Sequence, residues 1–147
     1  MTRFSFTKED RLTRDYIASE MKGAGLKVFE DAAGNLFGRR EGTVPGAPAV
    51  MVGSHFDSVK NGGAFDGPAG VVMGLEIARL LHENGIASEH PPEFAPLVEA
   101  EGARFGGGLY GSRAITGQGP REALEPFKDR AGVSAAEHMH DFGLATH

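Results

Sequence analysis

One stretch of the chain decides the fold: the apolar run Pro48-Ala-Val-Met-Val52, which leads directly into Gly53-Ser-His-Phe-Asp57. The apolar run is compact and uncharged, so we expect it to form a buried strand. His55 and Asp57 then fall at the carboxyl end of this strand, where open α/β sheets collect their ligands. An imidazole there can bind a divalent metal, and a carboxylate two residues on can orient the ring through its other nitrogen.

A glycine-rich loop and a helix follow this stretch. Asp66 lies in the loop just before Pro68, where we expect a helix to begin because proline suits the first helical turn. Apolar residues then recur at helical spacing until Gly85. A carboxylate at a helix N-terminus is stable and could bridge two metal ions, although Asp66 could equally be a helix cap. A lone histidine after a strand is more often structural, so it is the combination of His55, Asp66 and the glycines that favours a metal site.

The flanking segments alternate between predicted strands and helices. Thr7 with Asp10 three residues later predicts the start of a helix that ends near Gly23. The further predicted elements are strands at residues 26–29 and 36–38 joined by a turn, a strand at 94–98, a short helix at 109–115, and two small helices after Arg121, the second at 134–141. Pro96 is unfavourable within a central strand because it removes a ladder hydrogen bond. The alternation predicts an α/β fold, a layered mixed sheet flanked by helices.

Composition narrows the classes of function. The 147 residues fit one domain, with 40% hydrophobic residues and a net charge of −5. The negative charge disfavours binding to nucleic acid or to anionic membranes, and no apolar segment is long enough to span a bilayer. There is no cysteine, so disulfides and thiolate metal sites are excluded and any metal must be held by His, Asp or Glu. Residues 1–10 do not resemble a signal peptide, which predicts a cytoplasmic location.

Residues 50–81 resemble the N-terminal metal-site segment of the N-carbamoyl-L-amino-acid hydrolase and allantoate amidohydrolase family. That family belongs to the dinuclear-metal superfamily of aminoacylases and carboxypeptidase-like enzymes. The resemblance continues through residues 31–35, 101–105 and 111–114, and more weakly through 129–144, so it covers nearly the whole chain. It implies that residues 1–147 form a single but partial catalytic-type domain, a truncated form of a dinuclear-metallopeptidase-like domain. The family's lid and dimerisation domain and its C-terminal part have no counterpart here.

The resemblance also implies a role for each matched residue. His55 corresponds to a ligand of one metal and Asp57 to the residue that supports it, Asp66 to the carboxylate that bridges both metals, and Glu101 to a ligand of the second metal. The implied cofactor is zinc or manganese, and such ligands also accept cobalt or nickel. Because family ligands are missing, we expect this chain to bind the metal weakly or not at all. The implied substrate is a small linear ureido or amide compound, whose C–N bond is hydrolysed by a metal-bridging water while a glutamate accepts the proton.

The chain departs from this family at the position of that glutamate. Ala100 stands there, directly before Glu101, and an alanine cannot accept a proton. Losing a general base typically costs about 10²–10⁴ in rate. If the segment is extended, Glu99 points to the opposite face from Ala100 and is a poor substitute, although it would share a face with Glu101.

The family also uses two further histidine ligands that lie beyond position 147. His138 and His140 are poor replacements, because residues two apart on a helix face different directions. We interpret both as a solvated helix face, and His82, His90 and His147 likewise as ordinary surface residues.

Three functions stay open at this point. The chain could be a domain of a C–N hydrolase that needs a second polypeptide, a catalytically silent remnant that keeps the fold, or a binding module. Ala100 and the absent ligands favour an inactive or very weakly active chain. A domain of this kind leaves apolar surface uncovered, and exposed patches tend to self-associate, which predicts a homo-oligomer.

Overall fold

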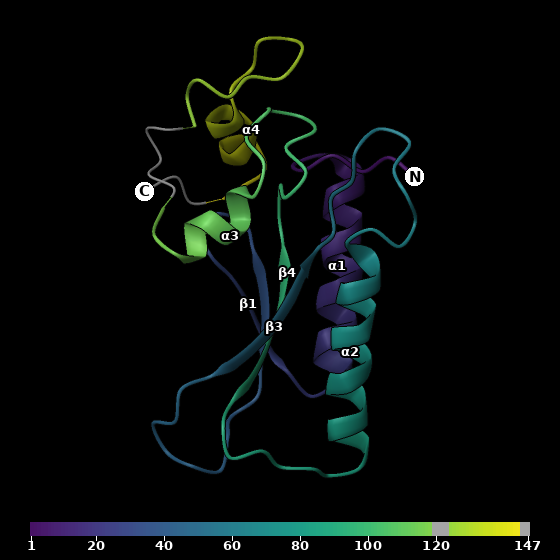
Figure 1. Cartoon of the computed structure of the whole chain (residues 1–147), viewed down its shortest axis with the longest axis vertical. Helices are drawn as coiled ribbons and strands as arrows, with labels where there is room; N and C mark the ends of the chain where they lie inside the picture. Colours follow the sequence, from purple (N-terminus) through teal and green to yellow (C-terminus); the bar gives the residue numbers. More distant parts are fainter. Residues whose placement is uncertain (119–123, 145–147) are drawn as a thin grey trace.

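The computed structural model describes residues 1–118 and 124–144. The elements follow in the order α1 (Lys8–Gly23), β1 (Lys27–Glu30), β2 (Leu36–Arg39), β3 (Val50–His55), α2 (Pro68–Glu83), β4 (Pro92–Leu97), α3 (Tyr110–Ile115) and α4 (Ala135–Asp141). The strands form one sheet in the order β1-β2-β4-β3, in which only the β3–β4 pair is parallel. Helices α1 and α2 lie side by side against the sheet, and α3 and α4 lie near one end of it (Figure 1). The predicted α/β fold, a mixed sheet flanked by helices, is confirmed.

Helix α1 begins where the sequence predicts it. The Thr7 side chain accepts a hydrogen bond from the Asp10 N–H at 3.3 Å, which caps the helix. The Asp10 carboxylate in turn accepts from the Phe6 N–H and pairs with Arg14 at 3.1 Å. Arg14 is buried, and it also contacts Glu30 at the end of β1. This ion-pair network ties α1 to the β1–β2 hairpin.

The hairpin turn is anchored by Asn35, which is fully buried. Its side-chain amide donates to the Asp31 carboxylate at 2.9 Å and to the Gly111 carbonyl at 3.0 Å, and its oxygen accepts from the Val98 N–H at 3.1 Å. The predicted strands on both sides of the turn are present, with β1 starting and ending one residue later than expected. Asn35 therefore joins the hairpin to the end of β4 and the start of α3.

The expectation of a buried strand at residues 48–52 is half wrong. A strand forms there, but it begins at Val50, and Val50, Met51 and Val52 are 60%, 45% and 43% exposed. The reason is its place in the sheet: β3 is an edge strand, paired with β4 on one side only. A strand's own residues do not specify what covers it, so an apolar run alone could not reveal this exposure.

Strand β4 passes through Pro96 without interruption, contrary to the expected difficulty. The Phe56 N–H after β3 donates to the Leu97 carbonyl at 3.2 Å, so Leu97 faces β3 and its neighbour Pro96 faces the other way. On that side, the pairing of β4 with β2 has already ended at Phe94. The missing N–H of Pro96 therefore falls where the ladder no longer needs a donor.

The C-terminal elements are partly as predicted. Helix α3 starts at Tyr110, one residue later than expected, and α4 follows a capping box in which Ser134 and Glu137 bond reciprocally. Two small helices were predicted after Arg121, and the prediction of the first one is wrong for residues 124–133. These residues form turns and one isolated bridge. Its first residues, 121–123, lie outside the described ranges. In residues 1–118 and 124–144, no helix is long and apolar enough to cross a membrane.

Candidate metal centre

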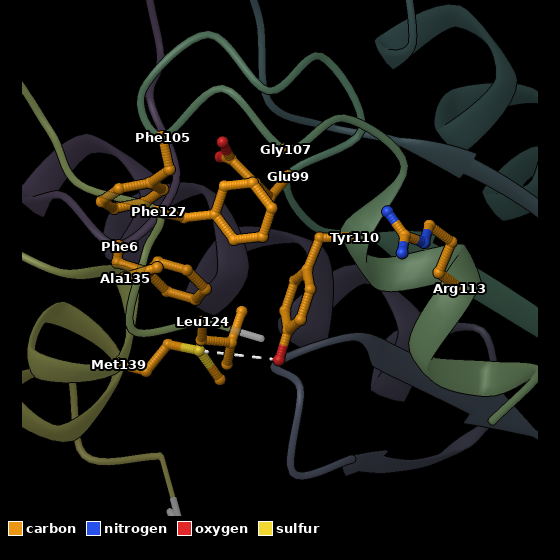
Figure 2. Close-up of a pocket in the computed structure, with 10 residues that line it drawn as sticks. All are labelled: Phe6, Glu99, Phe105, Gly107, Tyr110, Arg113, Leu124, Phe127, Ala135 and Met139. Carbon is orange, nitrogen blue, oxygen red and sulfur yellow. Dashed lines mark hydrogen bonds between the residues drawn. The ribbon is translucent and has the colours of Figure 1, made fainter. Parts of the chain in front are cut away.

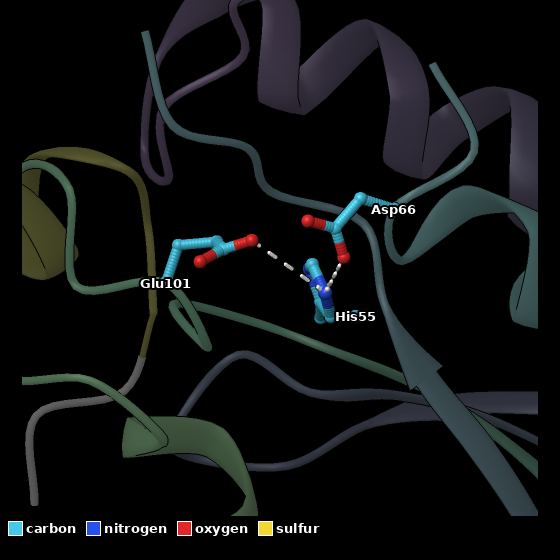
Figure 3. Close-up of side chains that lie close together, drawn as sticks. All are labelled: His55, Asp66 and Glu101. Atoms are coloured by element: carbon cyan, nitrogen blue, oxygen red, sulfur yellow. Dashed lines mark ion pairs between the residues drawn. The ribbon is translucent and has the colours of Figure 1, made fainter. Parts of the chain in front are cut away.

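Three predicted ligands meet at the carboxyl end of the parallel β3–β4 pair (Figure 3). His55 is the last residue of β3, Asp66 lies just before α2, and Glu101 lies in the loop after β4. The His55 Nε2 atom is 3.4 Å from an Asp66 carboxylate oxygen and 3.9 Å from a Glu101 carboxylate oxygen. One ligand atom from each of the three residues lies within 4.8 Å of the others. The structure thus brings together residues that are 46 positions apart in the sequence.

A glycine makes this close approach possible. Gly67 follows Asp66 with a φ of 81°, and a Cβ at this position would lie 2.5 Å from the His55 ring. The Ser54 hydroxyl donates to the Gly67 carbonyl at 2.9 Å and holds the loop against β3. The roles of Ser54 and Gly67 were not predicted from the sequence. The signal was present in the glycine-rich loop, because a left-handed residue next to a ligand calls for glycine.

Asp57 supports the site in two ways. Its backbone carbonyl lies 3.0 Å from the His55 Nδ1 atom, closer than its carboxylate at 3.6 Å. A proton on Nδ1 that donates to this carbonyl leaves the lone pair of Nε2 directed at Asp66 and Glu101. The buried Asp57 carboxylate accepts from the N–H groups of Ala100 and Glu101, each at 3.0 Å. The sequence predicted that the Asp57 carboxylate orients the ring, whereas the backbone carbonyl of Asp57 takes this place. The sequence did not predict that the carboxylate fixes the backbone of Glu101.

The donor set suits a divalent cation. It consists of one imidazole nitrogen and two carboxylates, which bind zinc, manganese, cobalt or nickel. Three protein ligands are the usual number at a catalytic zinc. The side chains of His55 and Glu101 are 18% and 24% exposed, whereas Asp66 is 67% exposed, so the site opens to solvent on the Asp66 side. Residues of this type in this arrangement can hold a metal ion within reach of a small substrate.

Glu99 does not reach this centre. The segment is not extended at this point, because Glu99 has a φ of 48°, so the expectation that it shares a face with Glu101 is wrong. Its side chain is 3% exposed and lines a mostly apolar pocket on the other side of the loop (Figure 2). Burial raises the pKa of its carboxyl group to about 7. Ala100 is therefore not replaced by its neighbour as a proton acceptor beside the metal ligands.

The remaining histidines stay away from the centre within the described ranges. His138 is not a solvated residue as expected: its ring is 20% exposed, lies 2.7 Å from the Asp129 carboxylate and contacts Arg104. His140 is 75% exposed, so the solvated interpretation holds there, and the two rings do not converge on one ion. His82 and His90 are exposed as expected, and His147 lies outside the described residues.

Comparison with known proteins gives a consistent result. The sequence profile of peptidase family M28 matches residues 35–131. An N-carbamoyl-L-amino acid amidohydrolase from Geobacillus stearothermophilus is 54% identical over 144 residues, 98% of this chain and 35% of that protein. An allantoate amidohydrolase from Bacillus subtilis is 37% identical over 145 residues, 98% of this chain and 35% of that protein.

The fold is shared with the same group of proteins. The crystal structure of a hydantoinase/carbamoylase family amidase from Burkholderia ambifaria superposes with a TM-score of 0.92 at 38% identity, over 98% of this chain and 35% of that one. The chain therefore spans about a third of the length of the relatives that it matches.

Proposed function

Since the chain belongs to peptidase family M28 and is similar to carbamoyl-amino-acid amidohydrolases, we propose that it is the metal-binding part of a hydrolase of linear amide or ureido C–N bonds. The observation that carries this proposal is the convergence of His55, Asp66 and Glu101 within 4.8 Å. The related proteins are named for N-carbamoyl amino acids and for allantoate, which are the substrate classes we propose.

Each residue of the centre has a distinct task in this proposal. His55, Asp66 and Glu101 hold the metal, which when bound activates water and polarises the scissile carbonyl as a Lewis acid. Asp57 keeps the His55 ring in place and fixes the backbone of Glu101 through two N–H bonds. Zinc or manganese fits this donor set, and cobalt or nickel is compatible with it. The cytoplasmic location stays a prediction from the sequence.

We propose further that this chain alone is inactive or very weakly active. The methyl group of Ala100 stands where a proton acceptor is needed, and Glu99 is turned into a different pocket. Losing a general base costs about 10²–10⁴ in rate. The same observations also fit an alternative function, in which the chain keeps the fold and binds metal but has no catalytic activity.

Metal titration tests the centre directly. We expect calorimetric titration of the metal-stripped chain with zinc and with manganese to show one binding event that His55→Ala and Asp66→Asn each weaken at least about tenfold, since each removes one ligand of about three. His140→Ala is the matched control, because this exposed histidine lies outside the centre. Equal loss in His55→Ala and His140→Ala would show that the chain binds metal only at scattered surface histidines.

The activity assay separates the absent base from the absent metal. With saturating metal, we expect ammonia release from N-carbamoyl amino acids or allantoate to be at least about 10²-fold slower in the native chain than in Ala100→Glu, because the substitution returns a carboxylate to this position. Turnover by the native chain at the rate of the variant would mean that Ala100 does not limit the reaction.

A different observation supports self-association. The exposed apolar residues of β3 continue on the neighbouring helix α2, where Met73, Ile77 and Leu80 are 64%, 45% and 49% exposed and recur on one face. We infer that a second copy of the chain covers this surface. An edge strand offers unpaired N–H and C=O groups, and an antiparallel copy related by a two-fold axis satisfies them. Val50–Ser54 carries no charge, so such pairing brings no like charges together.

The oligomeric state, measured by sedimentation, tests this inference. We expect the native chain to be dimeric at micromolar concentration and Met51→Lys to be monomeric, since lysine on an edge strand blocks strand pairing. Ile115→Lys, on α3, is the control and should leave the association unchanged. A native chain that sediments as a monomer at all concentrations would overturn the inference.

A further inference from the structure

The structure contains a cavity whose lining includes Glu99 but none of the three metal ligands. It is enclosed by the N-terminal segment, the loop after β4, and helices α3 and α4 (Figure 2). Its volume is about 30 Å³, whereas a single water molecule needs about 10–15 Å³ on the same measure. The cavity, which we call the Glu99 pocket, therefore has room for a molecule of two or three heavy atoms.

One polar group is aimed into this pocket. Glu99 is 3% exposed, and among the described residues its Oε1 atom has no hydrogen-bond partner. Its position is fixed by its backbone: its N–H donates to the Ser5 hydroxyl at 3.1 Å, and its carbonyl accepts from the Tyr110 N–H at 3.0 Å. Buried acceptors nearly always have a partner, and non-glycine residues with positive φ gather at functional sites. The carboxyl group also has hydrogen bonds with Ser5 and the Phe105 backbone, so Oε1 is the atom that is free to accept from a ligand.

Aromatic rings form much of the remaining wall. Phe6, Phe105, Tyr110 and Phe127 line the pocket together with aliphatic side chains. A Cβ on Gly107 would lie 2.9 Å from the Phe127 ring, so this glycine allows the ring to lie close against the loop. The faces of aromatic rings attract cations, and a carboxylate next to them adds a charge-assisted hydrogen bond. A neutral ligand would pack against the rings without this electrostatic attraction.

We propose that the Glu99 pocket binds a small protonated amine of the size of ammonium or methylammonium. The ligand donates to Glu99 and places its positive charge among the rings. The binding does not depend on the metal centre and is tested without it. Hydrolysis of a ureido group releases ammonia, so a ligand of this class arises in the reaction proposed above.

Two arginines near the pocket define the competing interpretation. Arg104 is engaged elsewhere, because one of its guanidinium nitrogens donates to the carbonyls of Ser5 and Phe6 at 2.5 and 3.0 Å. Arg113 lines the pocket from α3 and is exposed. The charge of Arg104 already favours the ionised form of Glu99, although Arg104 does not line the pocket. Arg113 is the cationic side chain in the lining and is the one that an external cation must compete with there.

Titration of the metal-free chain with methylammonium chloride at pH 8.5, followed by backbone amide NMR against matched sodium chloride, tests the proposal. We expect saturable shifts at Phe105, Gly107 and Tyr110, with a Kd on the order of 1–10 mM. Glu99→Gln keeps the shape of the side chain and should weaken binding at least about tenfold. Glu83→Gln removes a carboxylate from the exposed end of α2 and should leave the Kd unchanged.

Three outcomes would overturn the proposal. The first is the absence of saturable shifts in the native chain. The second is binding of equal strength in Glu99→Gln, which would assign the shifts to another site. The third is binding that appears only in Arg113→Ala, which would mean that Arg113 itself occupies the pocket. A folded amide spectrum of Glu99→Gln ensures that its loss of binding is read as loss of the carboxylate.

Discussion

The two edges of the sheet are built differently. Strand β1 has four residues, with Lys27 and Glu30 at its two ends, and Glu30 pairs with the buried Arg14. Strand β3 has six residues and presents uncharged side chains up to Ser54. Proteins protect sheet edges with short strands and charged residues, because an unpaired strand otherwise attracts another chain. Only β1 has these protections.

The difference divides the molecule into a closed side and an open side. The closed side contains the β1–β2 hairpin, α1 and the contacts of Asn35, which is buried and hydrogen-bonded to residues far away in the sequence. The open side contains β3 and α2, where large apolar side chains face solvent. His55 is the last residue of β3, so the candidate metal centre lies at the end of a strand of the open side. Stability should therefore come from the closed side, and association from the open side.

The largest expected effect is at Asn35. Substitution Asn35→Ala leaves the Val98 N–H buried without its partner and removes the hydrogen bonds that Asn35 donates to the Gly111 carbonyl and the Asp31 carboxylate. We expect a loss of about 3–4 kcal/mol in the free energy of unfolding, because an unpaired buried group costs about 1–3 kcal/mol and each lost hydrogen bond about 0.5–1.5 kcal/mol. Denaturant unfolding followed by circular dichroism measures it.

The matched control carries the same substitution on the open side. Asn84 caps α2, and its exposed amide donates to the Leu80 carbonyl at 2.9 Å. Asn84→Ala should cost less than about 1 kcal/mol, since water replaces an exposed partner. Equal losses at the two asparagines would contradict the division into a closed and an open side.

The next effect is the pH dependence of the free energy of unfolding that the buried Glu99 causes. Burial raises the pKa of Glu99 from 4.5 to about 7 in the folded chain. Between these values the folded state holds a proton that the unfolded state has lost, so stability falls as the pH rises from about 4.5 to 7. At about 1.4 kcal/mol per pKa unit, this shift corresponds to roughly 3.5 kcal/mol.

Comparison of the native chain with Glu99→Gln isolates this effect, because Asp10 and Glu30 also have pKa values raised by burial. We expect the stability difference between the two proteins, measured in the presence of a chelator, to change across this pH window and to be constant below pH 4. A difference that does not change with pH would mean that Glu99 is ionised in the folded chain throughout.

The sequence predicted the elements well and their surroundings poorly. The capping signal at Thr7 and the proline at the start of α2 located two helices, because these signals act within a few residues. The apolar run at Val50–Val52 located a strand but not its exposure. Burial depends on which strands and helices lie on either side, and the residues of one strand do not encode that.

The candidate site shows the same limit. His55, Asp66 and Glu101 were predicted as a group and do converge in space. The orientation of Glu99 was expected from an extended backbone, and one residue with positive φ reversed it. The second role of Asp57 depends on hydrogen bonds to residues more than 40 positions away. Local spacing predicts which residues form a site more reliably than it predicts how their backbone turns.

The smallest expected effect compares one substitution on the two sides. Val98 is fully buried, and Val98→Thr should cost about 1–2 kcal/mol, since a hydroxyl replaces a methyl group in the core. Val52 on β3 is 43% exposed, so Val52→Thr should cost less than about 0.5 kcal/mol in dilute protein. Unfolding at several protein concentrations measures both.

A cost at Val52 that grows with concentration would show that a second copy covers the open side, because association stabilises the folded state by mass action. A large cost at Val52 that is independent of concentration would instead mean that the chain itself covers β3, and the distinction between the two edges would fail.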